Sequence, residues 1–158
     1  MSTTIEYLSN KASEMEIAEH LLRCDADFVP PLSGRVKIND YAKKIAGKAK
    51  RFEAWSDDTL VALVAAYCND LEKGIVYITS VSVLKEWMGR GMAARLMSQC
   101  VEYAKSSGMR QISLEVASAN LPAIRLYEKI GFVTGKANPP FVSMDLYLKS
   151  AKKHEQQA

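Results

Sequence analysis

The chain has 158 residues, of which 48% are hydrophobic and 25% charged, and its net charge is +3 at neutral pH. These values are ordinary for one globular domain that buries its own core, and they exclude a disordered or fibrous protein. The basic residues are scattered and no run of them interleaves with aromatic residues, so we expect no binding to nucleic acid.

The N-terminal part is predicted to form a short strand and two helices. Thr4 to Leu8 predicts the strand, and Ser13 to Glu16 then has the form of a capping box that opens an amphipathic helix. Phe28 to Gly34 contains tandem prolines and cannot continue this helix, so it predicts a loop with exposed apolar side chains. Asn39 or Asp40 is then predicted to cap a second, short helix.

Three consecutive strands are predicted in the middle of the chain. Arg51 to Trp55 alternates in polarity and, after a turn at residues 56–58, Thr59 to Cys68 is a longer apolar run, so the two predict a β-hairpin. Asn69 to Gly74 predicts a second turn. Ile75 to Leu84 is almost entirely β-branched or aromatic, and we therefore expect it to be the central strand.

The remaining sequence predicts two further helices and three strands. Gly91 to Ser106 repeats apolar residues at the helical period, and Gln111 to Val116 alternates as a strand before a helix that starts at Asn120. Two short strands, Phe132-Val133 and Phe141 to Leu148, follow. The predicted order is β-α-α-β-β-β-α-β-α-β-β, a mixed α/β (α+β) class, with residues 1–150 as one domain and 151–158 as a polar C-terminal tail.

The cysteines and the N-terminal sequence bear on the cellular compartment. Cys24, Cys68 and Cys100 are odd in number and far apart, which fits neither a metal pattern nor a disulfide framework, so we expect reduced thiols. Met1 to Asn10 is too polar for a signal peptide, and no apolar run approaches the roughly 18 residues of a membrane span. The chain is therefore predicted to be cytoplasmic and not bound to a membrane.

No metal site is expected from the sequence. His20 falls on the predicted surface of the first helix and His154 in the polar tail, so both are predicted to be bystanders rather than bases or metal ligands. No Ser-His-Asp arrangement stands out either.

A glycine-rich segment lies where the central strand gives way to the following helix. Gly89, Gly91 and Ala93 leave backbone N–H groups free to approach an anion at the helix N-terminus, which indicates a phosphate ligand. A strand-to-helix turn without a ligand fits this segment equally well. The segment lacks the Gly-Lys-Ser/Thr ending of a Walker loop and the third glycine of a Rossmann fingerprint.

Three polar residues further on could take part in acid–base chemistry. Asn120 is an expected N-cap whose amide can also face a ligand, and Tyr127 lies two turns later on nearly the same helix face. Its phenol could protonate a leaving thiolate, although a lone tyrosine more often packs in a core. Glu115 points to the opposite face from its neighbours, where it could accept a proton from an amine or simply be solvated.

Together, the segment Met88 to Ala93 and the segment Asn120 to Phe132, with a strand between them, resemble the acyl-CoA-dependent N-acetyltransferases of the GNAT superfamily. The resemblance runs from about Ile75 to Leu148. It implies a central, mostly antiparallel sheet of six to seven strands that is splayed in the middle, with about four helices on its faces. It also implies acetyl-CoA as co-substrate, without metal, and direct acetyl transfer to a primary amine in a ternary complex.

The resemblance assigns roles to individual residues. The backbone at Val81, Ser82 and Val83 would pair with the pantetheine arm, with an amide near Val83 polarising the thioester carbonyl. Asn120 would bond to the pantetheine or acceptor side. The pyrophosphate would be held by the loop residues Gly89, Arg90, Gly91, Met92, Ala93 and Ala94.

The segment from Glu115 to Phe132 most resembles bacterial ribosomal-protein alanine N-acetyltransferases. Their base matches Glu115, and their general acid for the CoA thiolate matches Tyr127. The region from Phe28 to Arg35 does not resemble the corresponding part of those enzymes, so the acceptor does not transfer with the catalytic residues.

The acceptor site is predicted to include Phe28, Leu32 and Arg35, with Arg35 available to a carboxylate or phosphate of the substrate. The alternative is that Phe28 and Leu32 pack in the core and Arg35 is solvated. The acceptor is a small-molecule or peptide amine: a protein N-terminus, an amino sugar, an amino acid, a polyamine or a drug. We expect a monomer or a homodimer.

Two other functions stay open at this point. One is a non-catalytic CoA-binding or regulatory module, which is supported by Met88 because the family usually has Gln or Arg there. The other is a small module that binds ATP or NAD.

Overall fold

The computed structural model describes residues 4–149, and its helices and strands follow the predicted order. The strands of this part are β1 (Glu6–Ser9), β2 (Lys50–Ser56), β3 (Thr59–Asp70), β4 (Ile75–Val83), β5 (Gln111–Ala117), β6 (Val133–Asn138) and β7 (Phe141–Tyr147). Its α-helices are α1 (Glu14–Cys24), α2 (Ile38–Lys48), α3 (Met92–Ser106) and α4 (Leu121–Ile130). The predicted tail and His154 lie outside the described residues.

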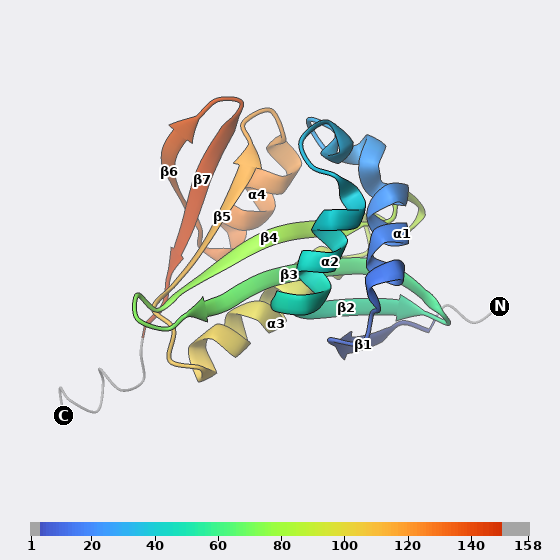
Figure 1. Ribbon diagram of the computed structural model, residues 1–158. Helices are drawn as coiled ribbons and strands as arrows, with labels where there is room; N and C mark the ends of the chain where they lie inside the picture. The colour runs from blue at the N-terminus through green and yellow to red at the C-terminus, as the bar shows by residue number, and fades with distance from the viewer. Residues whose placement is uncertain (1–3, 150–158) are drawn as a thin grey trace.

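One sheet contains the strands of this part in the order β1-β2-β3-β4-β5-β7-β6 (Figure 1). Neighbouring strands are antiparallel except for the pair β4–β5, which is parallel. The predicted mostly antiparallel sheet is therefore confirmed, and so is the central position of β4.

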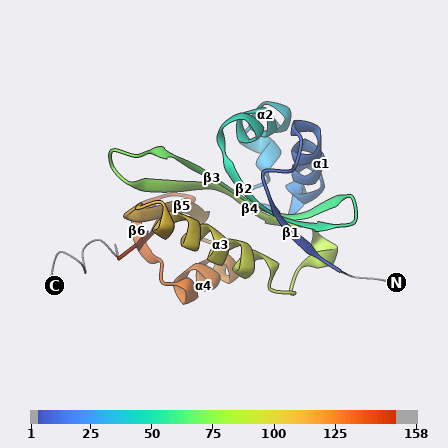
Figure 2. The same ribbon diagram turned by 90° about the horizontal axis from the view of Figure 1, so that it is seen from below.

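The helices cover both faces of the sheet. Figure 2 shows α1 and α2 on one face and α3 and α4 on the other. One hydrophobic cluster joins the sheet to α3 and, through Tyr127, to α4, and a second cluster lies under α1 and α2. Over residues 4–149, no helix has the length and apolar character needed to cross a membrane.

The sheet splays between its two central strands. The parallel ladder pairs Ile75–Ile78 with Gln111–Leu114 and ends there in the described structure. Just beyond this point β4 contains a bulge. Ile78 and Ser80 pair with the consecutive residues Ala66 and Ala65 of β3, so Thr79 between them is an extra residue in β4. Such a bulge bends the strand and increases its twist, which turns the rest of β4 away from β5. This geometry confirms the predicted splay.

The two helix starts on the α1–α2 face differ in how well the sequence predicted them. Ser13 forms the predicted capping box with Glu16, since each side chain accepts the backbone N–H of the other residue. The N-cap of α2 is Lys37, so the prediction of Asn39 or Asp40 was wrong. The helix starts earlier because Ile38 is buried with the core cluster under α1 and α2.

Polar and apolar residues alternate in β2, but its charged side chains do not face solvent. Arg51 and Glu53 are buried, and the Arg51 Nε donates to Glu53 Oε2 at 3.0 Å. Glu53 also accepts from the backbone N–H of Ala12 and from Trp55 Nε1, while Arg51 donates to the carbonyl of Ala12. Each charge is thus paired and hydrogen-bonded, which is the condition under which a buried ion pair is tolerated.

Candidate functional site

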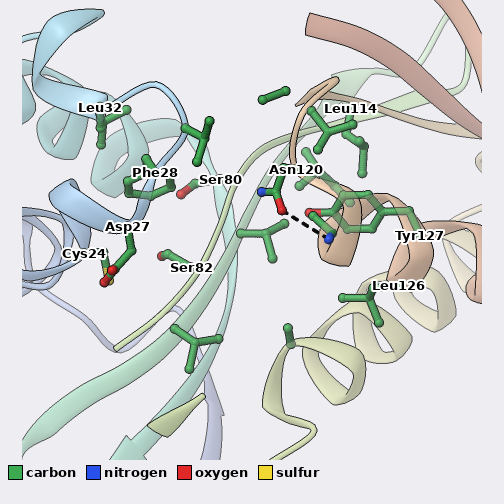
Figure 3. Close-up of a pocket in the computed structure, with 18 of the residues that line it drawn as sticks. Cys24, Asp27, Phe28, Leu32, Ser80, Ser82, Leu114, Asn120, Leu126 and Tyr127 are labelled. Carbon is green, nitrogen blue, oxygen red and sulfur yellow. Dashed lines mark hydrogen bonds between the residues drawn. The ribbon is translucent and has the colours of Figure 1, made fainter. Parts of the chain in front are cut away.

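A cavity of about 550 Å³ opens where β4 and β5 diverge. Residues of the α1–α2 segment form its wall on one face of the sheet, and residues of α3 and α4 form its wall on the other face (Figure 3). The cavity therefore reaches both faces of the sheet through the splay. Its volume is in the range of small-molecule and cofactor sites.

Nearly all the residues predicted for the site line this one cavity, although they come from five segments of the chain. Arg90 is the exception: its guanidinium lies over the Trp87 ring, 4.5 Å from the ring centroid. The predicted residues in the wall are Phe28, Leu32, Arg35, Val81, Ser82, Val83, Gly89, Gly91, Met92, Ala93, Ala94, Glu115, Asn120 and Tyr127.

The edge of β4 offers unpaired backbone groups to the cavity. Leu84 N donates to Val61 O of β3 at 2.8 Å. Successive N–H groups of a strand point to opposite edges, so the N–H of Val83 points away from β3 and into the gap. Beyond Ile78, the described part of β5 does not pair with this edge. A ligand can therefore add to β4 as an extra strand would.

The glycine loop has the conformation of an anion-binding turn. Gly89 and Gly91 have φ of +79° and +76°, a region that favours glycine over other residues. Gly91 is the N-cap of α3, and within the described residues nothing lies within 4 Å of a Cβ placed on either glycine. The first N–H groups of α3 and the positive end of its dipole thus face open space at the cavity wall.

Tyr127 is brought to the cavity by α4. Asn120 caps this helix by accepting the N–H of Ala123 at 3.3 Å, and Figure 3 shows the Tyr127 hydroxyl directed toward Asn120. Tyr127 is 6% exposed and packs against Phe132. Burial raises the pKa of Tyr127 to about 12, so the phenol is protonated at neutral pH. Its hydroxyl makes no hydrogen bond to any described residue, which leaves it free for a ligand.

Glu115 reaches the cavity from the opposite face of the sheet. Leu114 and Val116 belong to the core cluster on the α3 side, so Glu115 points toward α1 and α2. It is exposed and lines the cavity. Tyr77 of β4 lines the same cavity, where burial and then the charge of Glu115 raise the pKa of its phenol.

Side chains of the loop between α1 and α2 contribute both to the hydrophobic core and to the cavity wall. Leu32 is buried in the cluster under α1 and α2, and Phe28 packs against both core clusters, yet both line the cavity as well. Arg35 is not simply solvated, because its guanidinium lies 4.9 Å from the centroid of the Phe141 ring. No carboxylate of the described residues forms an ion pair with it.

The predicted surface position of His20 was wrong, whereas its prediction as a bystander to the chemistry stays a prediction. His20 is 2% exposed, and its Nδ1 lies 2.8 Å from Leu60 O, which can only accept, so Nδ1 carries the proton. The Nε2 atom, also at 2.8 Å, then accepts from the hydroxyl of Ser82. Burial lowers the pKa of His20 to about 4, which makes the ring neutral at pH 7 and a weak base.

Sequence reasoning also missed the polar residues beside the bulge in β4. The Tyr41 hydroxyl of α2 donates to Thr79 O at 2.6 Å and lies 2.7 Å from Thr79 Oγ1. Tyr41, Thr79 and Ser80 all line the cavity. No signal in the sequence identifies them, because the bulge and the contact with α2 arise from the folded chain.

The cysteines are free thiols, with Cys24 and Cys100 buried and Cys68 partly buried. Over the described range, no three His, Cys, Asp or Glu side chains gather in a way that could hold a metal ion.

The sequence matches a family model over most of its length and matches known proteins over part of theirs. A model of the Acetyltransferase (GNAT) family matches residues 15–132. The chain is 33% identical over 60 residues to N-alpha-acetyltransferase MAK3 of Arabidopsis thaliana. That match covers 38% of this chain and 32% of MAK3, which is about a third of the relative's length.

Solved structures share the fold over nearly the whole chain. The ribosomal-protein-S18-alanine N-acetyltransferase from Escherichia coli matches with a TM-score of 0.71 and 17% identity, covering 94% of this chain and 95% of that one. The PaiA N-acetyltransferase from Thermoplasma acidophilum, in complex with coenzyme A, matches with a TM-score of 0.67 and 14% identity, covering 92% and 99%. At these identities the likeness shows the fold.

Proposed function

The chain belongs to the GNAT family of acetyltransferases, and from this premise we propose that it transfers the acetyl group of acetyl-CoA directly to a primary amine. The observation that carries the proposal is the single cavity that reaches both faces of the sheet. It joins a glycine loop at a helix N-terminus to a carboxylate on the opposite face. Such a passage lets two substrates meet from opposite sides, as transfer in a ternary complex requires.

The α3–α4 side of the cavity is the proposed acetyl-CoA site. The N–H groups around Gly91 suit a pyrophosphate, and the free edge of β4 from Val81 to Val83 suits an amide-containing arm. Asn120 would face the same arm. The relative solved with coenzyme A shares this fold, which supports the assignment.

Three groups would carry out the transfer. Glu115 would take a proton from the ammonium form of the acceptor, directly or through water, so that a neutral amine attacks the thioester. The N–H of Val83 would stabilise the negative charge that develops on the carbonyl oxygen. Tyr127 would act as the general acid by donating a hydrogen bond to the leaving sulfur.

The α1–α2 side is the proposed acceptor site. Phe28 and Leu32 offer apolar surface there, and the Arg35 guanidinium has no carboxylate partner among the described residues. Arg35 would therefore pair with a carboxylate or phosphate of the acceptor. A peptide amine and a small-molecule amine both fit this description.

A non-catalytic CoA-binding module is the less favoured function. Met88 stands in the cavity wall where the family usually has Gln or Arg, but the candidate base Glu115 and the candidate acid Tyr127 line the same cavity. A module without turnover would have no need of both.

The three cysteines are free thiols, which supports a location in a reducing compartment such as the cytoplasm.

The test is a thiol-release assay with acetyl-CoA and a panel of amines that spans amino acids, amino sugars, polyamines and N-terminal peptides. We expect at least one amine to accelerate thiol release and to gain the mass of an acetyl group. Tyr127→Phe serves as the matched slow control. Coenzyme A binding without acetylation of any amine would favour the non-catalytic module instead.

A further inference from the structure

Two serines two residues apart on β4 have opposite hydrogen-bond states. Ser80 and Ser82 are each 6% exposed, and both line the cavity. Ser82 donates to His20 Nε2 at 2.8 Å. The Ser80 Oγ is fully buried and has no hydrogen-bond partner among the described residues.

A buried hydroxyl without a partner lowers the stability of the free protein and therefore calls for an explanation. Burial raises the pKa of Tyr41 to about 12, and Ser80 lies near enough to its hydroxyl to oppose that rise, but the hydrogen bonds of this hydroxyl at 2.6 and 2.7 Å both go to Thr79. In Figure 3, Ser80 lies beside Phe28, on the proposed acceptor side of the cavity. An acceptor that binds against this wall can supply the partner that the buried hydroxyl lacks.

Ser80 also lies opposite the candidate base. The ladder between β4 and β5 ends at Ile78 and Leu114, so Ser80 is two residues beyond the end on one strand and Glu115 one residue beyond it on the other. Both side chains are on the α1–α2 face of the sheet. An acceptor whose amine faces Glu115 therefore has its next few atoms beside Ser80.

We propose that Ser80 is a specificity-determining residue that hydrogen-bonds an oxygen of the acceptor, a hydroxyl or a carbonyl, within a few bonds of the reacting amine. A serine hydroxyl can donate to a carbonyl and can both donate to and accept from a hydroxyl. The acceptor class is then amino alcohols and α-amino carbonyl compounds rather than simple alkylamines. This inference rests on the proposed acetyl transfer.

Stability measurements on Ser80→Ala and Ser82→Ala provide the first half of the test. Ser80→Ala removes a hydroxyl that has no partner, so the melting temperature of the free protein should stay the same or rise. Ser82→Ala removes the donor to the buried His20 Nε2, so the melting temperature should fall. Coenzyme A affinity should be unchanged in Ser80→Ala.

Matched acceptors provide the second half. Ethanolamine and glycinamide carry an oxygen near the amine, and propylamine is of similar size without one. With kcat/KM expressed per neutral amine, to remove the difference in basicity, we expect Ser80→Ala to lower the value for the two oxygen-bearing amines by about tenfold relative to propylamine, the scale of one hydrogen bond. The wild-type preference over propylamine should shrink by this factor. Whether the loss in Ser80→Ala is larger with ethanolamine or with glycinamide distinguishes a hydroxyl from a carbonyl.

The proposal is overturned if Ser80→Ala keeps the wild-type preference, or if it loses as much thermal stability as Ser82→Ala. Its failure is separate from failure of acetyl transfer. If no amine is acetylated, the same amine pairs can be titrated into the complex with coenzyme A, where loss of the binding preference in Ser80→Ala still supports the role of Ser80 and equal binding contradicts it.

Discussion

Tyr127 is the residue whose surroundings bear most directly on the proposed chemistry. It is buried at the cavity wall, and burial raises the pKa of its phenol to about 12. Because this value exceeds the roughly 8.5 of a thiol, full proton transfer from Tyr127 to the free thiolate is uphill, and the main contribution of Tyr127 is a hydrogen bond donated to the sulfur while negative charge develops on it.

Replacing Tyr127 with Phe separates this chemistry from packing. The ring and its contact with Phe132 are kept, and the lost hydroxyl makes no hydrogen bond to the described residues, so the free energy of unfolding should hardly change. We expect kcat to fall by roughly 10² with little change in acetyl-CoA affinity. Steady-state kinetics and a binding titration check this. A variant that turns over like wild type would show that Tyr127 only packs.

Glu115 gives a prediction about pH. If it takes the proton of the ammonium group, Glu115→Gln should lower kcat by about 10² or more near neutral pH. The loss should shrink as pH rises, because more of the amine is then neutral without help from a base. A pH–rate profile of both forms measures this. A constant ratio of the two rates at every pH would argue against Glu115 as the base.

His20 gives a prediction about acid stability. Burial lowers its pKa from 6.5 to about 4 in the folded protein. Between these values the unfolded chain binds more protons than the folded one, so stability falls as pH drops through this window and is unaffected above it. The full loss amounts to about 3 kcal/mol.

His20→Gln is the matched control for this effect, since an amide does not titrate. Urea unfolding at several pH values between 4 and 7 should give a steeper loss of stability for wild type than for the variant. Carboxylates that titrate in the same window contribute equally to both proteins. Identical slopes would mean that the pKa of His20 is the same in the folded and the unfolded chain, which would contradict its burial as a neutral ring.

At the scale of single elements, the junction of β4 and α3 is the part most sensitive to one substitution. Gly91 has φ of +76°, and a Cβ added there meets no neighbour among the described residues, so a valine acts mainly by straining the backbone. Relaxation of that strain would move the first N–H groups of α3. Gly91→Val should therefore abolish the thermal shift caused by coenzyme A, while Gly47→Ala in α2, also in open space and with ordinary φ, should not. Retention of the full shift in Gly91→Val would remove the loop from the cofactor site.

The elements differ in how well the sequence predicted them, for physical reasons. β4 and α3 were predicted closely because a run of β-branched residues and a sustained helical period are local signals. The early start of α2, the bulge at Thr79 and the burial of His20 depend on contacts with distant parts of the chain. The sequence motifs predicted that the glycine loop, Glu115 and Tyr127 belong to one site. No motif contains Ser80 or Tyr41, and only the folded structure places them in the cavity wall.

At the scale of the whole molecule, the splay of the sheet accounts for the candidate site. The bulge in β4 opens a gap, α3 and α4 line it on one face, and the α1–α2 segment lines it on the other. The family match over residues 15–132 spans these parts. Beyond it, β7 adds Phe141 to the cavity wall. The central claim is that this gap holds acetyl-CoA.

Thermal unfolding in the presence of coenzyme A, ATP or NAD tests that claim most directly, because a ligand that binds the native state alone raises its stability by mass action. At a hundredfold excess over Kd the gain is about 2.7 kcal/mol, which corresponds to roughly 5 to 10 °C in Tm for a chain of this size. We predict this rise with coenzyme A and acetyl-CoA and a much smaller one with ATP or NAD. An unchanged Tm at millimolar coenzyme A, or a larger rise with ATP or NAD, would contradict the account.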